Sequence, residues 1–127
     1  MLNQTGIKKT TYGGPVQILF NVQNQMSVGI RVDDAYSVTR EGRKIVPAGT
    51  PLSGDLTARN TAFVKAVDTT NPATGVLLHD VDVTDGDANG TLLIWGFVDL
   101  NKVDSTTATL ITATRITELA GRVTFLK

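Results

Sequence analysis

Four aspartates that lie close together in the chain are the first candidates for chemistry. They are Asp80, Asp82, Asp85 and Asp87. Hard cations such as Ca²⁺ prefer clustered carboxylate oxygens, but the spacing does not fit a helix–loop–helix calcium loop. Thr84 and Thr91 stand where that loop supplies an acidic ligand. In an extended strand Asp80 and Asp82 share one face, which is typical of the solvated side of a half-buried strand. We therefore expect no metal site here.

His79 is the only histidine, and the chain contains no cysteine. Nucleophilic catalysis would require a serine activated by this imidazole. None of the serines lies in a nucleophile-elbow motif, and the pair Gly13–Gly14 lacks the strand, lysine and helix that surround a phosphate-binding loop. The serines that would have to converge on His79 are Ser27, Ser37, Ser53 and Ser105. We expect no catalytic site, no cofactor and no enzyme activity, and we interpret His79 as a surface or interface residue.

The composition is that of one small domain without a dominant charge. The chain has 127 residues, and twelve basic side chains balance twelve acidic ones. A chain of this length supports one hydrophobic core. A net charge of zero supplies no summed field for nucleic acid or an anionic membrane, and no stretch approaches the roughly 18 apolar residues of a membrane span. We therefore expect neither partner. The N-terminus lacks the apolar run of a signal peptide, which predicts synthesis in the cytoplasm of the producing cell.

Charge is unevenly distributed along the chain. Residues 1–46 carry six basic and three acidic groups, residues 47–104 carry three and eight, and residues 105–127 carry three and one. The middle is therefore acidic and both ends are basic. This distribution suits docking through complementary patches, and it equally fits solvated charge scattered over the surface.

Alternation of apolar and polar residues predicts short strands over most of the chain. Residues 16–22 and 28–32 should form one hairpin, and residues 76–83 and 91–98 should form a second around the turn-rich loop 84–90. Further short strands are predicted at residues 44–46, 62–67 and 123–126. Pro47 and Pro51 should frame a rigid corner, because each fixes φ and removes a backbone donor.

Apolar residues at helical spacing predict one helix over about residues 106–120. Ser105 or Thr106 could cap it, and Gly121 stands where a C-terminal glycine belongs. Six threonines between residues 106 and 117 argue against it, since β-branching lowers helix propensity. The sequence thus predicts a mainly β fold, a small antiparallel β-sandwich or barrel-like module with one short C-terminal helix at about 106–120.

The segment Leu92–Phe97 is nearly all apolar, which predicts a strand buried on both faces, against a partner sheet or another subunit. Gly96 in its middle indicates a bulge or a close backbone approach. Trp95 and Phe97 are core residues in one interpretation. In the other they are buried between subunits, where aromatic side chains are enriched.

Residues 1–14 are polar, contain three glycines and show no amphipathic period, which predicts an extended N-terminal arm. Pro15 closes this arm, and residues 15–127 should form a single β-rich domain. The arm carries Ile7, Tyr12 and the pair Lys8–Lys9. These side chains suit a partner that offers a groove, a sheet edge or acidic groups.

Four segments of turns and apolar strands follow one another in a distinctive order. They are Pro47–Leu52, Ala73–Leu78, Gly90–Leu100 and Arg115–Phe125. This order resembles the head decoration and head-fibre proteins of tailed bacteriophages, which include the lambda-type decoration proteins. The resemblance implies a β-rich module that trimerises, sits at local threefold points on the outside of an assembled capsid and clamps the coat subunits together.

Several residue roles follow from this resemblance. It implies that the arm docks on the lattice of the major capsid protein, through Ile7, Lys8, Lys9, Tyr12 and Pro15. The candidates for the trimer interface are then Leu92, Ile94, Trp95 and Phe97. Residues 15–46 exceed what a minimal decoration protein needs, which makes them a candidate docking hairpin or the base of a longer head fibre. The alternative function is a stand-alone β domain that binds carbohydrate or peptide through loops 68–74 and 84–90.

Overall fold

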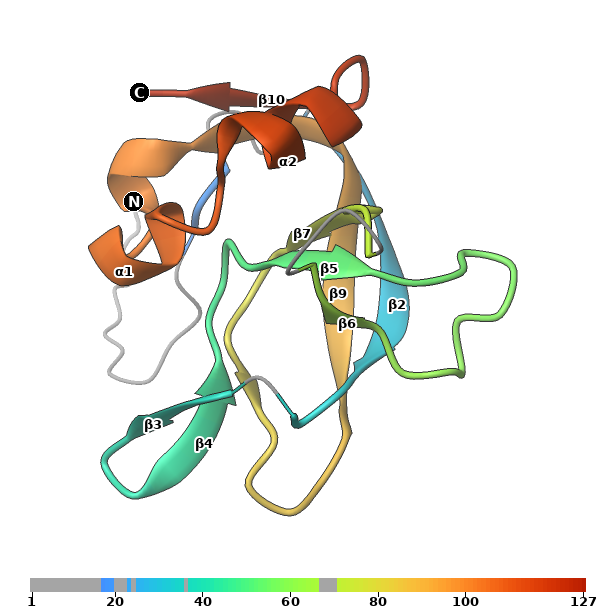
Figure 1. Cartoon of the computed structure of the whole chain (residues 1–127), viewed down its shortest axis with the longest axis vertical. Coiled ribbons are helices and arrows are strands. Elements are labelled where there is room, and N and C mark those ends of the chain that lie inside the picture. Colours follow the sequence, from blue (N-terminus) through green and yellow to red (C-terminus); the bar gives the residue numbers. More distant parts are fainter. Residues whose placement is uncertain (1–16, 20–22, 24, 36, 67–70) are drawn as a thin grey trace, which may run out of the picture.

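The structure, a computed structural model, describes residues 17–19, 23, 25–35, 37–66 and 71–127 (Figure 1). Strand residues make up 41% of it, and the helices are few and short. The chain folds into two sheets with a sandwich-like or barrel-like shape, which confirms the mainly β fold expected from the sequence.

Within the described residues, the larger sheet contains six strands and the smaller sheet contains three. In the larger sheet the order is β10 (Val123–Leu126), β9 (Ala88–Asp99), β7 (Gly75–Leu77), β5 (Pro51–Ser53) and β6 (Val64–Lys65), with β2 (Met26–Val32) also paired with β9. The smaller sheet has the order β3 (Val38–Arg40), β4 (Arg43–Val46) and β8 (Val81–Asp82). The described helices are η1 (Leu100–Lys102), α1 (Ser105–Ala108) and α2 (Ala113–Glu118).

The long strand β9 organises the larger sheet. Its first part, Ala88–Trp95, pairs antiparallel with β2, and its last part, Gly96–Asp99, pairs parallel with β10. Figure 1 shows β9 running through the molecule, with α2 and β10 at one end and the β3–β4 hairpin projecting at the other. β2 and β7 occupy its two edges at Leu92 and Leu93, and the two core clusters cover its two faces there.

Neither predicted hairpin is found as expected. β2 pairs with β9, and Leu19 forms its bridge with Val98, so residues 16–22 and 28–32 do not form a hairpin in the described part of the chain. Residues 26–46 instead supply β2, β3 and β4 to the two sheets. The predicted strand 76–83 is divided, because β7 pairs with β9 while β8 leaves to pair with β4. Only its first half has the predicted antiparallel partner.

The predicted helix 106–120 is also divided, into α1 and α2. Asp104, rather than Ser105 or Thr106, caps α1 by accepting a hydrogen bond from the Thr107 N–H. Thr112 then accepts a hydrogen bond from the Arg115 N–H and starts α2. Threonine side chains compete in this way with continuous helical bonding. Gly121 has a φ of 84°, as expected for the glycine that ends the helical segment.

The predicted corner at Pro47–Pro51 joins the two sheets. Thr50 donates hydrogen bonds to the Pro47 carbonyl from its backbone N–H (3.2 Å) and from its hydroxyl (2.7 Å). Gly49 has a φ of 96°, and a Cβ at this position would lie 2.7 Å from Val103 Cγ1. The tight turn therefore requires glycine and packs against the segment that follows η1.

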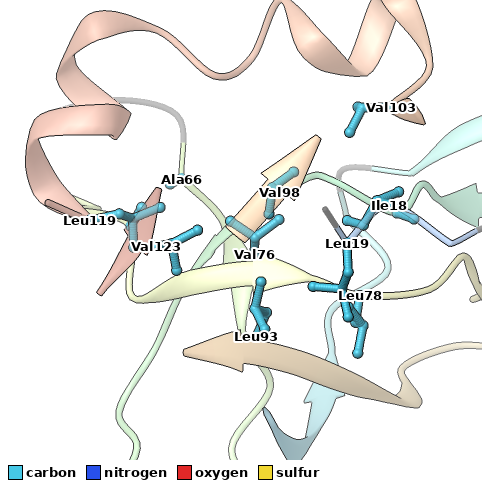
Figure 2. Packing of buried hydrophobic residues seen from close by; sticks show 12 residues of the cluster. Ile18, Leu19, Ala66, Val76, Leu78, Leu93, Val98, Val103, Leu119 and Val123 are labelled. Atoms are coloured by element: carbon cyan, nitrogen blue, oxygen red, sulfur yellow. The ribbon is translucent and has the colours of Figure 1, made fainter. Parts of the chain in front are cut away.

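Two clusters of buried apolar side chains form the core. On β7 and β9, adjacent residues alternate between them: Val76 and Leu93 point into the first cluster, and Leu77 and Leu92 into the second. Figure 2 shows the first cluster, which also contains Ile18, Leu19, Val98, Leu119 and Val123. The second cluster includes Ile30, Val32, Val46, Leu52 and Phe63. Both faces of β9 are buried at Leu92 and Leu93, as the apolar run predicted.

Candidate assembly surface

A bulge in β9 turns two aromatic side chains away from the core. β2 advances by one residue, from Met26 to Ser27, while β9 advances by two, from Trp95 to Leu93. A bulge of this kind reverses the alternation of side chains along the strand. As a result Val98, and not Phe97, joins Leu93 in the first core cluster. Trp95 and Phe97 follow this reversal along β9, so they do not point into the first core cluster.

Trp95 and Phe97 form an aromatic pair at the surface. Their ring centroids are 6.3 Å apart and their planes meet at 64°, which is an edge-to-face contact. Gly96 between them has a φ of 155°, a value that L side chains rarely adopt. Trp95 is 46% exposed and Phe97 is half-buried. The pair therefore has a defined geometry but offers apolar area to solvent.

Met26 extends this apolar surface across the sheet. It is the register partner of Trp95 on β2, and it is 58% exposed. We refer to Met26, Trp95 and Phe97 as the aromatic patch. Aromatic and methionine side chains are enriched in protein interfaces, and apolar groups gathered on a rigid strand are typical of a surface that another protein covers.

The other two predicted interface residues lie further inside the subunit. Leu92 is 0% exposed and belongs to the second core cluster, against which the half-buried Ile94 also packs. Leu92 therefore has no surface to offer another subunit, and we remove it from the interface candidates. The predicted arm residues Ile7, Lys8, Lys9, Tyr12 and Pro15 lie outside the described residues.

Two of the four clustered aspartates pair with arginines of the smaller sheet. Asp80 Oδ2 lies 3.3 Å from Arg40 Nη1, and its other oxygen accepts a hydrogen bond from the Ala48 N–H at 2.7 Å. Asp82 forms an ion pair with Arg43 and also accepts hydrogen bonds from Thr84. Hydrogen bonds from Arg43 and Thr84 hold the pKa of the Asp82 carboxyl well below its usual range. These contacts fasten β8 and the corner to the β3–β4 hairpin.

Asp87 lies in a different group, with Asp33 and Asp34, a juxtaposition that sequence spacing did not indicate. One carboxylate oxygen from each of the three lies within 4.8 Å of the others. Asp87 Oδ1 accepts a hydrogen bond from the Asp34 N–H, and Asp33 Oδ1 accepts one from the Ala35 N–H. The group therefore joins the end of β2 to the loop that precedes β9.

His79 lies between β7 and β8, where the chain passes from one sheet to the other. Its Nδ1 atom is buried, and within the described residues it has no hydrogen-bond partner. No described hydrogen bond joins His79 to a serine or a carboxylate, so the structure brings no Ser–His–Asp arrangement together in the part of the chain that it describes. The prediction that His79 is a surface or interface residue stays a prediction.

Comparison with models of known protein families found no match, and a search of curated proteins found no similar sequence. Among the described residues, none of the helices has the length and apolar character needed to cross a membrane. The fold and the aromatic patch are therefore the observations on which a function can be argued.

Proposed function

We propose that this protein is a structural decoration, or cement, protein of a tailed-bacteriophage head. In this proposal it binds the outer surface of the assembled capsid at local threefold positions as a homotrimer, and it stabilises the shell. It has no catalytic role, and its partners are the major capsid protein lattice and other copies of itself. The resemblance of four segments to the head decoration and head-fibre proteins motivates the proposal.

The aromatic patch is the observation that supports the proposal best. Met26 and Trp95 leave roughly half of their surface exposed although they lie opposite each other on paired strands. Covering apolar area of this kind is favourable by about 25 cal/mol per Å². In a closed trimer each subunit covers the same patch by the same contact, so this patch does not drive further association.

The most direct test is electron microscopy of purified particles that contain or lack the protein. A decoration protein should add threefold density to the outer surface at a regular set of lattice positions, and particles without it should break at a lower temperature. Single copies at positions without threefold symmetry would contradict the trimer. Absence of the protein from particles would favour the stand-alone ligand-binding domain instead.

The arm offers a second test that separates docking from folding. Residues 1–14 contain few apolar side chains, so removing residues 2–14 should leave the thermal midpoint of the free domain nearly unchanged. Backbone pairing with a coat strand, with Ile7 and Tyr12 in pockets, would supply much of the affinity for the particle. The truncated protein should therefore decorate particles poorly. Equal decoration by the truncated and full-length chains would contradict a docking role for the arm.

A further inference from the structure

A second surface feature lies at the outer edge of β2, next to the loop between β5 and β6. An open cleft of about 600 Å³ lies here, lined by Gly29, Ile30 and Arg31 of β2, by Arg59 and Asn60 of the loop, and by Asn89 and Gly90 of β9. A Cβ added at Gly29 would meet no atom within 4 Å, so the cleft is open to solvent above this residue. The aromatic patch does not contribute to it.

The backbone of β2 presents unused hydrogen-bonding groups to this cleft. The Arg31 carbonyl accepts a hydrogen bond from the Phe63 N–H at 2.8 Å, which shows that Arg31 directs its backbone away from β9. The Gly29 carbonyl, two residues earlier, accepts one from Arg59 Nη1 at 2.8 Å and faces the same way. The N–H groups of Gly29 and Arg31 point to the same edge, since an extended residue directs both its groups to one side. Within the described residues neither N–H has a partner at that edge.

The cleft also has a distinct charge. Arg31 and Arg59 are both exposed, and no carboxylate is among the lining residues. Elsewhere in the described chain Arg40, Arg43 and Arg115 each form an ion pair with a carboxylate, whereas Arg31 and Arg59 form none. Arg59 uses one of its donors on the Gly29 carbonyl, which leaves the rest of its guanidinium free to bind an anion.

We propose that this edge binds an extended, acidic peptide segment of a partner protein by strand addition. The segment accepts hydrogen bonds from the free N–H groups of Gly29 and Arg31, and its carboxylates bind the guanidinium groups of Arg31 and Arg59. A peptide strand gains affinity from backbone hydrogen bonds and specificity from side-chain sites. The edge that precedes the Val32–Phe63 bridge offers both, in the N–H groups of Gly29 and Arg31 and in the two arginines. Charged hydrogen bonds from arginine to a carboxylate select an acidic segment over a neutral one. The inference goes beyond the capsid proposal, because it assigns a separate binding site at β2 and specifies the partner segment as extended and acidic.

Arg59 has two roles in this arrangement. In the free protein its guanidinium covers the Gly29 carbonyl, which protects an exposed strand edge from unspecific pairing. In the complex the remaining donors of its guanidinium bind a carboxylate of the incoming strand. An arginine that only protected the strand edge would weaken the binding of every peptide, whatever its charge.

The test uses the full-length chain and a labelled, end-blocked peptide of seven residues in which valine alternates with aspartate. Fluorescence anisotropy at low salt should detect binding, and the same peptide with asparagine in place of aspartate should bind about tenfold more weakly. A peptide that is N-methylated on the residues facing β2 keeps its charge but cannot form the ladder, so its binding should be lost. In NMR spectra the amide protons of Gly29 and Arg31 should exchange more slowly with solvent when the peptide is bound.

Matched variants complete the test. Arg31→Gln and Arg59→Gln should each weaken binding about tenfold, whereas Lys44→Gln, the same loss of charge on an exposed residue of β4, should change it by about twofold or less. The proposal is overturned if the N-methylated or the asparagine peptide binds as tightly, or if Lys44→Gln has the same effect. It is also overturned if the aspartate peptide does not bind at millimolar concentration, or if Arg59→Gln strengthens binding.

Discussion

Arg115 and Glu118 form a buried ion pair, with Arg115 Nη1 2.7 Å from Glu118 Oε1 and only 5% of Arg115 exposed. The pair joins α2 to the segment that leads into β7. Arg115 also donates a hydrogen bond to the Asn71 carbonyl, and Glu118 Oε1 accepts one from the Ala73 N–H at 2.8 Å. The C-terminal helices are thereby fastened to the larger sheet through polar contacts as well as through the first core cluster.

Replacing Arg115 by alanine should lower the free energy of unfolding by about 3 to 5 kcal/mol, because the carboxylate of Glu118 would remain largely buried without its partner. Urea denaturation followed by circular dichroism measures this quantity. The control is Arg43→Ala, which removes an exposed arginine from an ion pair and should have a much smaller effect. An equal loss of unfolding free energy in the two variants would mean that burial of the Arg115–Glu118 pair adds nothing to the cost of breaking it.

Gly75 and Gly29 provide a second matched pair of substitutions. A Cβ at Gly75 would lie 2.5 Å from the Leu93 carbonyl oxygen, so alanine there must push β7 away from β9. We expect Gly75→Ala to lower the free energy of unfolding by about 1 to 3 kcal/mol. Gly29 has no atom within 4 Å of the same position, and Gly29→Ala should change stability by no more than about 0.5 kcal/mol. A neutral Gly75→Ala would show that the two strands do not approach as closely as the structure indicates.

The pair between Asp82 and Arg43 predicts how stability depends on pH. Its hydrogen bonds hold the pKa of the Asp82 carboxyl below the value of about 3.9 expected in an unfolded chain. The pair therefore stabilises the fold above that pH, and its contribution is lost as the pH falls through the folded-state pKa. The thermal midpoint of the natural chain should exceed that of Asp82→Asn at neutral pH, and the difference should shrink below about pH 4.

Arg43→Gln removes the same pair from the other side and should reproduce this trend. Salt should reduce the difference at neutral pH, because both side chains are exposed and their attraction is screened. A difference that stays constant down to acidic pH would show that the ionised carboxylate of Asp82 does not contribute to the stability of the fold.

Local signals in the sequence predicted where strands and turns lie better than they predicted which strands pair. The strand ending at Val46, the corner at Pro47–Pro51 and the terminal strand at residues 123–126 could be predicted, because proline, glycine and alternating apolar residues act over a few positions. The passage of β8 to the smaller sheet could not, since it depends on Asp80 and Asp82 meeting arginines about 40 residues away. The parallel pairing of β10 with β9 is equally non-local.

The candidate sites show the same limit. The apolar run at Leu92–Phe97 predicted burial, and Gly96 indicated a bulge or close approach. Neither signal shows which face of the sheet carries Trp95. The register between β2 and β9 decides this, because a shift of one residue moves a side chain to the other face. The cleft at Gly29 and Arg59 was missed, since its residues come from three separate segments.

Trp95 is the only tryptophan in the chain, so its fluorescence reports directly on the aromatic patch. If subunits associate through this patch, raising the protein concentration or adding particles should shift the emission to shorter wavelength and reduce quenching by iodide. Trp95→Ser should lower the mass measured by sedimentation from that of a trimer to that of a monomer. The domain should remain folded, because much of this side chain is already in solvent.

Ile116→Ser is the control for this experiment. Ile116 is an exposed apolar residue of about the same accessibility, but it lies on α2 and outside the aromatic patch. Its replacement should leave the trimer intact, because truncating a residue outside an interface core changes association little. A trimer that persists in Trp95→Ser, or one that is lost equally in both variants, would mean that the aromatic patch is not the surface through which the subunits meet.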